Sequence, residues 1–405
     1  MLKKKEERVN FFINEMNISF IQNEIRNLAQ QFDSVNVFTF KVDKEFEAPG
    51  NVFVFEVDYK GYSTLNVLFK NLFAFISIIF IELFKAPNYL LNLSKLKNVT
   101  SDLLRCFYLA GRLISEDKLE QDKSINYTFW FNQWATVLSI LKRKNLIKNY
   151  VARAHGADLY EERVPIIKRI PFRWFQLRHV KTVFCVSNQG SKYLKDKYNM
   201  FSNKVQCAYL GTKDFGMGLL ESQDTFTIVS CAHVRNIKRI HRIPEILQYI
   251  NFPIHWIHIG SEHKTDPTVK LLHENVSRLT NEKSNVKVSF LGALSNDQIY
   301  EYYKRNYVNL FVSVSETEGL PVSMMEAISF GIPILSTEVG GCNEIVTTET
   351  GILFNKDFES KEVANLIEEE YRIKRFDKGS REVIRKFWES KFDSKKNMDY
   401  FMQFV

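Results

Sequence analysis

Cysteine is scarce in this 405-residue sequence, and no long unbroken hydrophobic run is present. The five cysteines are scattered without a CxxC pair, which argues against a zinc site or a disulfide framework and predicts buried, reduced thiols. The longest apolar run, residues 72–81, is well short of the roughly 20 residues that a spanning helix needs. The basic start lacks an unbroken apolar stretch and a small-residue cleavage site, so a secretory signal is not expected. We therefore expect a chain that is not integral to a membrane.

The overall composition is that of a globular protein. Apolar residues make up 45% of the chain and charged residues 25%, which excludes intrinsic disorder and collagen-like repeats. No internal repeat or low-complexity tract is present. Because 405 residues exceed what one hydrophobic core usually supports, two domains are expected.

Positive charge is concentrated in the N-terminal half. Residues 1–215 carry 32 Lys and Arg against 21 Asp and Glu, whereas the remaining residues carry 23 against 26. A basic half suggests an anionic partner, either nucleic acid or anionic lipid. Residues 163–181 interleave six cations with Ile, Phe and Trp, which suits lipid head groups above acyl chains. The same mixture suits a helix that covers the core with long basic stems, and no RNA-binding or zinc-finger pattern supports nucleic acid.

A second apolar segment, residues 65–93, is rich in Phe and Ile and has Lys70 and Lys85 at its flanks. It has two interpretations. One is a buried helix of the first domain. The other is a membrane-dipping element that meets a lipid-linked acceptor, and together with residues 163–181 it would form a peripheral docking face.

Strand-like and helical stretches alternate along the C-terminal half. Short β-rich runs occupy residues 226–231, 254–260, 286–292, 308–314, 332–336 and 351–354, with helical patterns between most of them. Their apolar centres predict strands covered on both faces, and the alternation predicts a parallel, doubly wound α/β sheet. Ligands of such sheets bind at the carboxyl ends of the strands. The loops after Cys231, Gly260, Gly292 and Val314 are therefore the expected site.

The N-terminal half shows the same alternation less regularly. Strands are expected over residues 8–13, 35–40, 52–57, 124–129, 150–154 and 182–187. We predict a first α/β domain over residues 1–215 and a second over 216–382. A C-terminal helix within 383–405, about 383–401, is expected to cross back to the first domain. Two such domains leave a cleft, a common place for a substrate.

The most informative stretch is residues 314–346. It places Glu318 in the loop after an expected strand and Glu326 eight positions later, inside a helix that Pro321 opens. The amides of this helix start form an anion site, and helical rise puts Glu326 about 7.5 Å along the axis from Pro321. A diphosphate at the helix start would have a ribose near Glu326 and a sugar near Glu318. Taken singly, the two glutamates are better explained as a helix-start acid and a solvated side chain. Together with the neighbouring glycine pair, Gly340 and Gly341, and the strand context, they favour the ligand site.

Five segments carry a resemblance to a known family. Residues 318–346, EGLPVSMMEA followed by FGIPILSTEVGGCNEIV, resemble the E-x7-E region of retaining GT-B glycosyltransferases of the large sucrose-synthase and mannosyltransferase-like family, family 4. SCAHVRNIKRIHRIPEIL is similar to the family's strand, loop and helix that supply diphosphate-binding cations. VSFLGALSNDQIYEYY resembles its nucleotide-base loop, and RAHGADLY resembles its HGxD element. The start of the chain, FFINEMNISFIQNEIRNL, looks like the variant N-terminus of exopolysaccharide transferases.

The resemblance implies a GT-B fold, in which two Rossmann-like α/β domains, an acceptor side and a nucleotide-sugar donor side, face each other across a cleft. It implies that His155 reaches the donor sugar from the first domain, that Lys238 holds the diphosphate and that Glu318 holds sugar hydroxyls. The other implied donor-binding residues are Glu326 at the ribose and Gly319, Leu320, Val322, Gly292, Leu294, His233 and Arg239. His233 stands where the family usually has Arg, so Arg235 or Arg239 is a candidate to replace that contact.

The implied activity is transfer of a sugar from a nucleotide diphosphate sugar to a glycan or lipid-linked glycan, with retention, in surface-polysaccharide synthesis at the inner face of the cytoplasmic membrane. No metal or cofactor is expected, because Lys238 and helix amides would neutralise the diphosphate and the sequence has no DxD pair. Nucleic acid is not an expected partner. One alternative is a non-catalytic GT-B module that binds a nucleotide or a partner enzyme at the membrane. Another is a soluble transferase that makes a storage glucan or a disaccharide.

Overall fold

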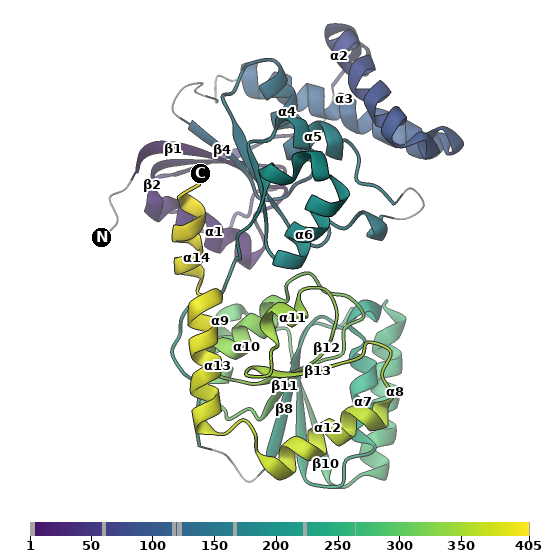
Figure 1. The fold of residues 1–405 in the computed structure, drawn as a ribbon, viewed down its shortest axis with the longest axis vertical. Helices are drawn as coiled ribbons and strands as arrows, with labels where there is room; N and C mark the ends of the chain where they lie inside the picture. The colour runs from purple at the N-terminus through teal and green to yellow at the C-terminus, as the bar shows by residue number, and fades with distance from the viewer. Residues whose placement is uncertain are drawn as a thin grey trace. The chain divides into compact units, whose positions relative to one another are not determined.

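The computed structural model describes residues 5–58, 62–115, 119, 124–164, 168–221, 225–263 and 265–404. The chain divides into two compact units (Figure 1). Unit 1 comprises Met1–Ala208 and Phe401–Val405, and unit 2 comprises Tyr209–Tyr400. Unit 2 begins before residue 216 because the Tyr209 hydroxyl donates to Glu344 and the Thr212 amide donates to the carbonyl of Phe392, both within unit 2.

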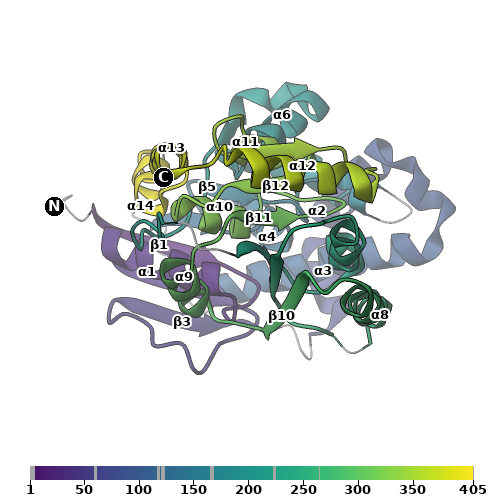
Figure 2. The same cartoon turned by 90° about the horizontal axis from the view of Figure 1, so that it is seen from below.

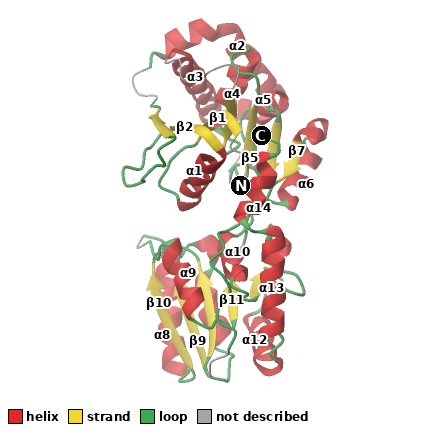
Figure 3. Cartoon of the chain, turned by 90° about the vertical axis from the view of Figure 1, so that its left-hand side faces the viewer, coloured by secondary structure: helices red, strands yellow, loops and turns green. Residues whose placement is uncertain are grey.

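Unit 1 is built on a seven-stranded parallel sheet of order β3-β2-β1-β4-β5-β6-β7, with β3 (Figure 2) and β7 (Figure 3) as its edge strands. Its strands are β1 (Lys5–Phe12), β2 (Phe32–Thr39), β3 (Val52–Glu56), β4 (Ser124–Thr128), β5 (Tyr150–Ala154), β6 (Thr182–Cys185) and β7 (Val205–Cys207). Its helices are α1 (Ser19–Gln31), α2 (Thr64–Lys85), α3 (Leu93–Ser115), α4 (Gln133–Arg143), α5 (Arg173–His179) and α6 (Asn188–Lys197). The interior strand β5 is buried along its whole length, as expected where helices cover both faces.

A row of buried asparagines crosses the middle of this sheet. The parallel register pairs Asn10 of β1 with Asn36 of β2 and with Asn126 of β4. The Asn36 amide donates to Oδ1 of Asn10 at 3.0 Å, and the Asn10 amide donates to Oδ1 of Asn126 at 3.1 Å. Asn126 donates in turn to the carbonyl of Asn149. Because a buried amide is costly unless it is bonded, this row favours one register of the three strands.

The two apolar segments of unit 1 differ in how far their side chains are buried. Helix α2 packs against α3 beside the sheet (Figures 1 and 2), but only Ile78 and Glu82 of its residues are buried. The prediction of a buried helix is therefore wrong for most of its surface. In residues 168–181 the apolar side chains Phe172, Phe175 and Leu177 are buried, so the core-covering interpretation is correct there. Ile166 and Ile167 lie outside the described residues.

Helix α2 also changes the expectation about membrane spans. It has 22 residues with a mean hydropathy of 2.1 over its most apolar window, so it is long and apolar enough to cross a membrane by length and composition. The run of residues 72–81 is shorter than this helix because Lys70 and Asn71 interrupt the apolar sequence, and at Asn71, where φ is −127° and ψ is 15°, α2 is kinked.

Unit 2 is built on a six-stranded parallel sheet of order β10-β9-β8-β11-β12-β13. Its strands are β8 (Phe226–Cys231), β9 (Ile254–Ile259), β10 (Val286–Gly292), β11 (Leu310–Ser313), β12 (Ile334–Thr337) and β13 (Gly351–Phe354). Its helices are α7 (Ile243–Leu247), α8 (Pro267–Glu282), α9 (Asn296–Arg305), α10 (Val322–Ser329), α11 (Cys342–Ile345), α12 (Ser360–Ile373) and α13 (Lys378–Lys391). Helix α8 lies on one side of the sheet and α9 on the other (Figures 1 and 3). The predicted α/β class and doubly wound parallel sheets are confirmed in both units.

The C-terminal residues form two helices where one was expected. Helix α13 ends at Lys391 and α14 (Ser394–Met402) begins three residues later, because the carbonyl of Phe392 and the amide of Ser394 bond to the backbone of Thr212. Phe401 is fully buried in unit 1. Its ring centroid lies 5.1 Å from that of Tyr127 and 4.2 Å from the Arg153 guanidinium carbon.

Candidate functional site

The structure brings Lys238 and Glu318 together in unit 2. Lys238 lies in the loop that follows β8, and Glu318 lies in the loop that follows β11. Strands β8 and β11 are parallel neighbours, so both loops leave the same edge of the sheet. Nζ of Lys238 lies 2.5 Å from Oε1 of Glu318, whose side chain is 10% exposed. An ammonium and a carboxylate thus meet at the strand ends, where a ligand of such a sheet is expected.

Arg239 fastens these two loops to each other. Its backbone is left-handed, with φ 49°, and its guanidinium donates to the carbonyls of Val314 at 2.8 Å and Ser315 at 3.2 Å. The amide of Glu316 donates to the carbonyl of Ile237 in the opposite direction. Arg239 was predicted to bind the donor, and the structure places its guanidinium on loop carbonyls. This arrangement holds Lys238 and Glu318 at a fixed separation.

The paired glycines after β12 allow a third loop to approach. Gly340 has φ +53°, and a Cβ built there would lie 2.0 Å from the carbonyl oxygen of Glu318. The amide of Gly341 donates to the carbonyl of Gly319 at 2.6 Å. Only glycine satisfies both the backbone conformation and this close approach. The glycine pair of the sequence therefore supports the backbone that carries Glu318.

The start of α10 lies directly after Glu318 and Gly319. Pro321 has an extended ψ of 115° and caps the helix, so the first helical residue is Val322 and not Pro321 itself. The first bond of the helix runs from the amide of Met325 to the carbonyl of Pro321. The amides of the preceding three residues have no acceptor inside the helix and point along its positive end, which suits an anion. The predicted residues Gly319, Leu320 and Val322 all belong to this turn.

Glu326 lies inside α10 and is 4% exposed. The Tyr300 hydroxyl of α9 donates to its Oε1 at 3.1 Å. Burial raises the pKa of Glu326 to about 7, and the Tyr300 hydrogen bond opposes this only in part. Burial likewise raises the pKa of the Cys231 thiol to about 12, and the nearby Glu326 carboxylate adds to the effect. Contact of Glu326 with a ribose stays a prediction.

The ends of β8, β9 and β10 complete this edge of the sheet. A Cβ on Gly260 would lie 1.9 Å from the carbonyl oxygen of Ala232, and the Gly260 amide donates to the carbonyl of Gly292 at 2.8 Å. His233 is exposed, and its Nδ1 lies 2.6 Å from Oγ of Ser261. The predicted residues His233 and Gly292 therefore share the edge with Lys238. Leu294, the last of the predicted base-loop residues, packs partly buried against the unit 2 core.

His155 lies in unit 1, directly after β5. Its ring stacks on Phe129 with centroids 4.6 Å apart, and its backbone amide donates to Oδ1 of Asp158 at 2.6 Å. The other carboxylate oxygen of Asp158 accepts from the amide of Phe131 at 2.7 Å. Burial would raise the pKa of Asp158, but the hydrogen bonds from His155 and Phe131 outweigh it and lower that pKa. The role of His155 toward a donor sugar stays a prediction.

Arg173 supports this loop and was missed as a site residue. It is fully buried, donates to the carbonyls of Phe131 and Asp158, and bonds to Oε1 of Gln176 at 2.9 Å. Arg173 therefore links the backbone at Phe131 to the loop of residues 155–158, and the Asp158 carboxylate bridges the same two segments. In the sequence Arg173 is one cation of a basic stretch, and only the fold separates it from its exposed neighbours.

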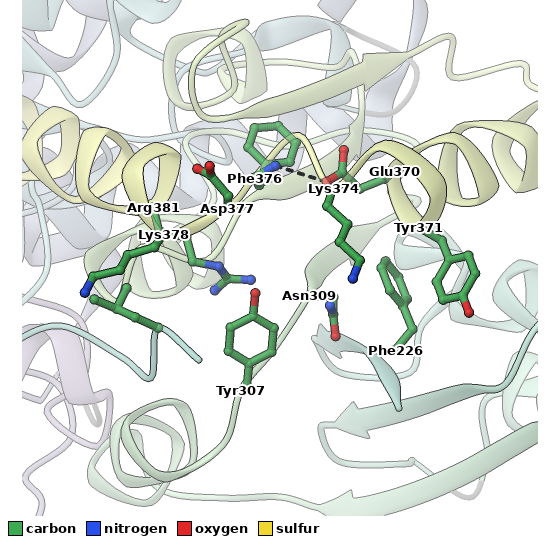
Figure 4. Close-up of a pocket in the computed structure, with 11 residues that line it drawn as sticks. Phe226, Tyr307, Asn309, Glu370, Tyr371, Lys374, Phe376, Asp377, Lys378 and Arg381 are labelled. Atoms are coloured by element: carbon green, nitrogen blue, oxygen red, sulfur yellow. Dashed lines mark hydrogen bonds between the residues drawn. The ribbon is translucent and has the colours of Figure 1, made fainter. Parts of the chain in front are cut away.

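A cavity of about 380 Å³ lies away from these residues (Figure 4). Its lining includes Phe226, the first residue of β8, and Asn309, which directly precedes β11. The cavity therefore opens at the amino ends of the strands, opposite to the edge that carries Lys238 and Glu318. Among the described residues, no group of three or more His, Cys, Asp or Glu side chains could hold a metal ion.

Comparisons with known proteins match most clearly the part of the chain that carries Lys238 and Glu318. Residues 221–382 match the sequence profile of the family described as Glycosyl transferases group 1. The O-antigen biosynthesis glycosyltransferase WbnH of Escherichia coli is 36% identical over 73 residues, which is 18% of this chain and 20% of that protein. The lipopolysaccharide core biosynthesis mannosyltransferase LpsB of Rhizobium meliloti is 29% identical over 105 residues, 25% of this chain and 29% of that protein.

The fold is shared over a much longer span than the sequence. The crystal structure of Anabaena HepE in complex with UDP covers 98% of this chain and 98% of its own, with a TM-score of 0.69 and 14% identity. By contrast, the matched segments span less than a third of either curated relative. Residues 221–382 therefore carry a Glycosyl transferases group 1 domain, within a chain whose two parallel-sheet units have the GT-B fold of glycosyltransferases.

Proposed function

We propose that the chain is a retaining glycosyltransferase that moves a sugar from a nucleotide diphosphate sugar to a glycan or lipid-linked glycan in surface-polysaccharide synthesis. The observation that carries this proposal is the Lys238–Glu318 pair at the start of α10, inside the Glycosyl transferases group 1 domain. The UDP bound to HepE supports a nucleotide-linked donor. The names of WbnH and LpsB support an O-antigen or lipopolysaccharide type of product.

Each site residue of unit 2 has a defined part in the proposed reaction. Lys238 and the first amides of α10 neutralise the diphosphate as the bond to the sugar breaks. Glu318 accepts hydrogen bonds from sugar hydroxyls, and Glu326 accepts them from the ribose. The proton of the acceptor hydroxyl passes to the leaving phosphate on the same face, which retains the anomeric configuration. With these groups the proposed reaction uses no metal ion and no cofactor.

Unit 1 is proposed to serve the acceptor. A lipid-linked acceptor would place the reaction at the inner face of the cytoplasmic membrane. The excess of Lys and Arg over Asp and Glu in residues 1–215, most of which belong to unit 1, supports an anionic partner for this unit.

The first experiment is donor hydrolysis by the full chain with a panel of nucleotide sugars. Wild-type protein should release nucleoside diphosphate slowly from one or a few donors. Replacing Lys238 with alanine should lower kcat by about 10²–10³-fold, as for the loss of one preorganised charge-stabilising donor. The matched control is Lys270→Ala, because Lys270 is 84% exposed on α8 of the same unit and lies outside the site.

Several results would overturn the proposal. Wild-type turnover by Lys238→Ala would remove the charge-stabilising role. Tight nucleotide binding without hydrolysis of any donor, and without transfer to any acceptor, would favour the non-catalytic module. A product whose new bond has the opposite anomeric configuration, read by NMR, would exclude retention, and a rate abolished by EDTA would exclude metal independence.

A further inference from the structure

Helix α2 presents a continuous apolar face to solvent. Phe69, Phe73, Ile76, Phe80 and Phe84 are between 54% and 88% exposed. After the kink at Asn71, a spacing of three or four residues places Phe73, Ile76, Phe80 and Phe84 on one side of the helix, over a length of about 16 Å, and Phe69 precedes the kink. We call these five residues the α2 apolar face. A contiguous apolar surface of this kind is unusual on a soluble unit and marks a site of interaction.

The opposite side of α2 is fixed to the rest of unit 1. Ile78 is buried, and the Glu82 carboxylate accepts from Nε of Arg169 at 3.0 Å and from the amide of Phe172 at 3.1 Å. The Arg143 guanidinium also donates to Oγ of Ser77 at 2.9 Å. The helix is therefore docked on unit 1 through residues 77–82. A spanning position would bring the Glu82–Arg169 ion pair into hydrocarbon, which is costly.

The apolar surface continues past the end of α2. Leu90 and Leu91, in the turn after α2, are 57% and 87% exposed, and Leu93, the first residue of α3, is 78% exposed. They add exposed apolar side chains directly after the helix. The segment from α2 to the start of α3 thus offers long apolar side chains that none of the described elements of unit 1 covers.

The exposed charged side chains of the segment that carries the face, residues 64–97, have one sign. The segment from Thr64 to Lys97 holds four lysines, and its only acidic residue is Glu82, which is 2% exposed and paired. Lys70 and Lys85 are exposed on α2 itself. Apolar side chains with lysines beside them, and no exposed carboxylate, match acyl chains below anionic head groups.

We propose that the α2 apolar face docks unit 1 on an anionic lipid bilayer, with α2 lying in the plane of the interface. The charges disfavour a second copy of the chain, because a self-complementary pairing of this face would bring lysines of both copies together, and residues 64–97 carry no exposed acidic side chain to pair with them. The docking adds a membrane surface to the proposed function. It depends on that function only for the expectation that a lipid-linked acceptor lies in the same membrane. The docking face expected from the sequence combined residues 65–93 with residues 163–181, and the proposal keeps only the first segment because Phe172, Phe175 and Leu177 of the second are buried.

The test is flotation of the full chain with vesicles of phosphatidylcholine alone or mixed with phosphatidylglycerol. Wild-type protein should float with the mixed vesicles, and less so with the neutral ones or at high salt. The double variant Phe73→Glu, Phe80→Glu should partition at least about tenfold more weakly. The control is Phe53→Glu, because Phe53 is a comparably exposed phenylalanine on edge strand β3, outside the face, at 52% exposure.

Three readouts separate the outcomes. Flotation of the double variant like wild type would overturn the proposal, as would a wild-type dimer in light scattering that does not float and that the variant dissociates. The variant Phe73→Ala, Phe80→Ala should bind with intermediate strength, which tests the face without new charge. Donor hydrolysis should be unchanged in all of these variants, so a chain that floats but hydrolyses no donor would contradict the proposed function and leave the docking intact.

Discussion

Replacing Glu326 with glutamine is expected to stabilise unit 2 at neutral and alkaline pH. Glu326 is 4% exposed, and burial raises its pKa from an ordinary value of 4.5 to about 7. Glutamine has nearly the same shape and keeps a carbonyl oxygen that can accept from Tyr300. The substitution therefore removes the titrating proton with little change in packing.

The sign and size of the effect follow from proton binding. Between pH 4.5 and about 7 the folded state holds the proton of Glu326 more tightly than the unfolded chain does. The stability from this group is therefore complete below pH 4.5, falls as the pH rises and is lost above about pH 7. At 1.36 kcal/mol per pH unit, the difference between 4.5 and about 7 corresponds to about 3 kcal/mol.

The assay is urea denaturation of wild type and Glu326→Gln at several pH values between 4 and 8. The free energy of unfolding of the variant relative to wild type should rise by about 3 kcal/mol across this range. The control is Glu316→Gln, since Glu316 is exposed in the neighbouring loop. A difference between Glu326→Gln and wild type that stays constant with pH would show that burial does not raise this pKa, and would refute the reasoning.

Three further substitutions test the packing around the site and in the sheet. Gly340→Ala should cost about 1–3 kcal/mol and lower donor hydrolysis, because its Cβ would meet the Glu318 carbonyl; unchanged stability and activity would contradict the close approach. Asn10→Leu should cost about 1–3 kcal/mol for each buried asparagine left unpaired on the neighbouring strands, measured by urea denaturation; a cost below 1 kcal/mol would show that the row contributes little. Arg173→Met should destabilise unit 1 by about 3 kcal/mol and release the Asp158 loop to hydrogen exchange; protection equal to wild type would exclude its positioning role.

The strand ends of unit 2 could be predicted from the sequence because one rule covers them. Parallel strands with apolar centres send their following loops to one edge, so Lys238 and Glu318 were expected to meet, and they do. Several strand boundaries, such as those of β8, β10 and β13, agree with the apolar runs to the residue. The close approach of Gly340 to Glu318 could not be predicted from the apolar runs, because it depends on how two loops pass each other.

Burial on the helices of unit 1 could not be read from composition. The apolar side chains of residues 168–181 and the α2 apolar face look alike as sequence, yet the first set is buried and the second is exposed. The difference depends on which side of each helix meets its neighbours, and that is decided by partners far along the chain, such as Glu82 with Arg169. Arg173 could not be recognised from the sequence for the same reason, because its burial depends on partners far along the chain.

The position of Phe401 has a consequence for the order in which the chain matures. Unit 1 is interrupted, since its main part ends at Ala208 and its remaining residues follow the whole of unit 2. During translation the ribosome completes unit 2 before it adds the ring that fills the space beside Tyr127 and Arg153. Unit 1 is thus the first unit to be synthesised and the last to be completed. Removal of residues 401–404 should leave unit 1 without the Phe401 ring in its core, while unit 2 keeps all its residues.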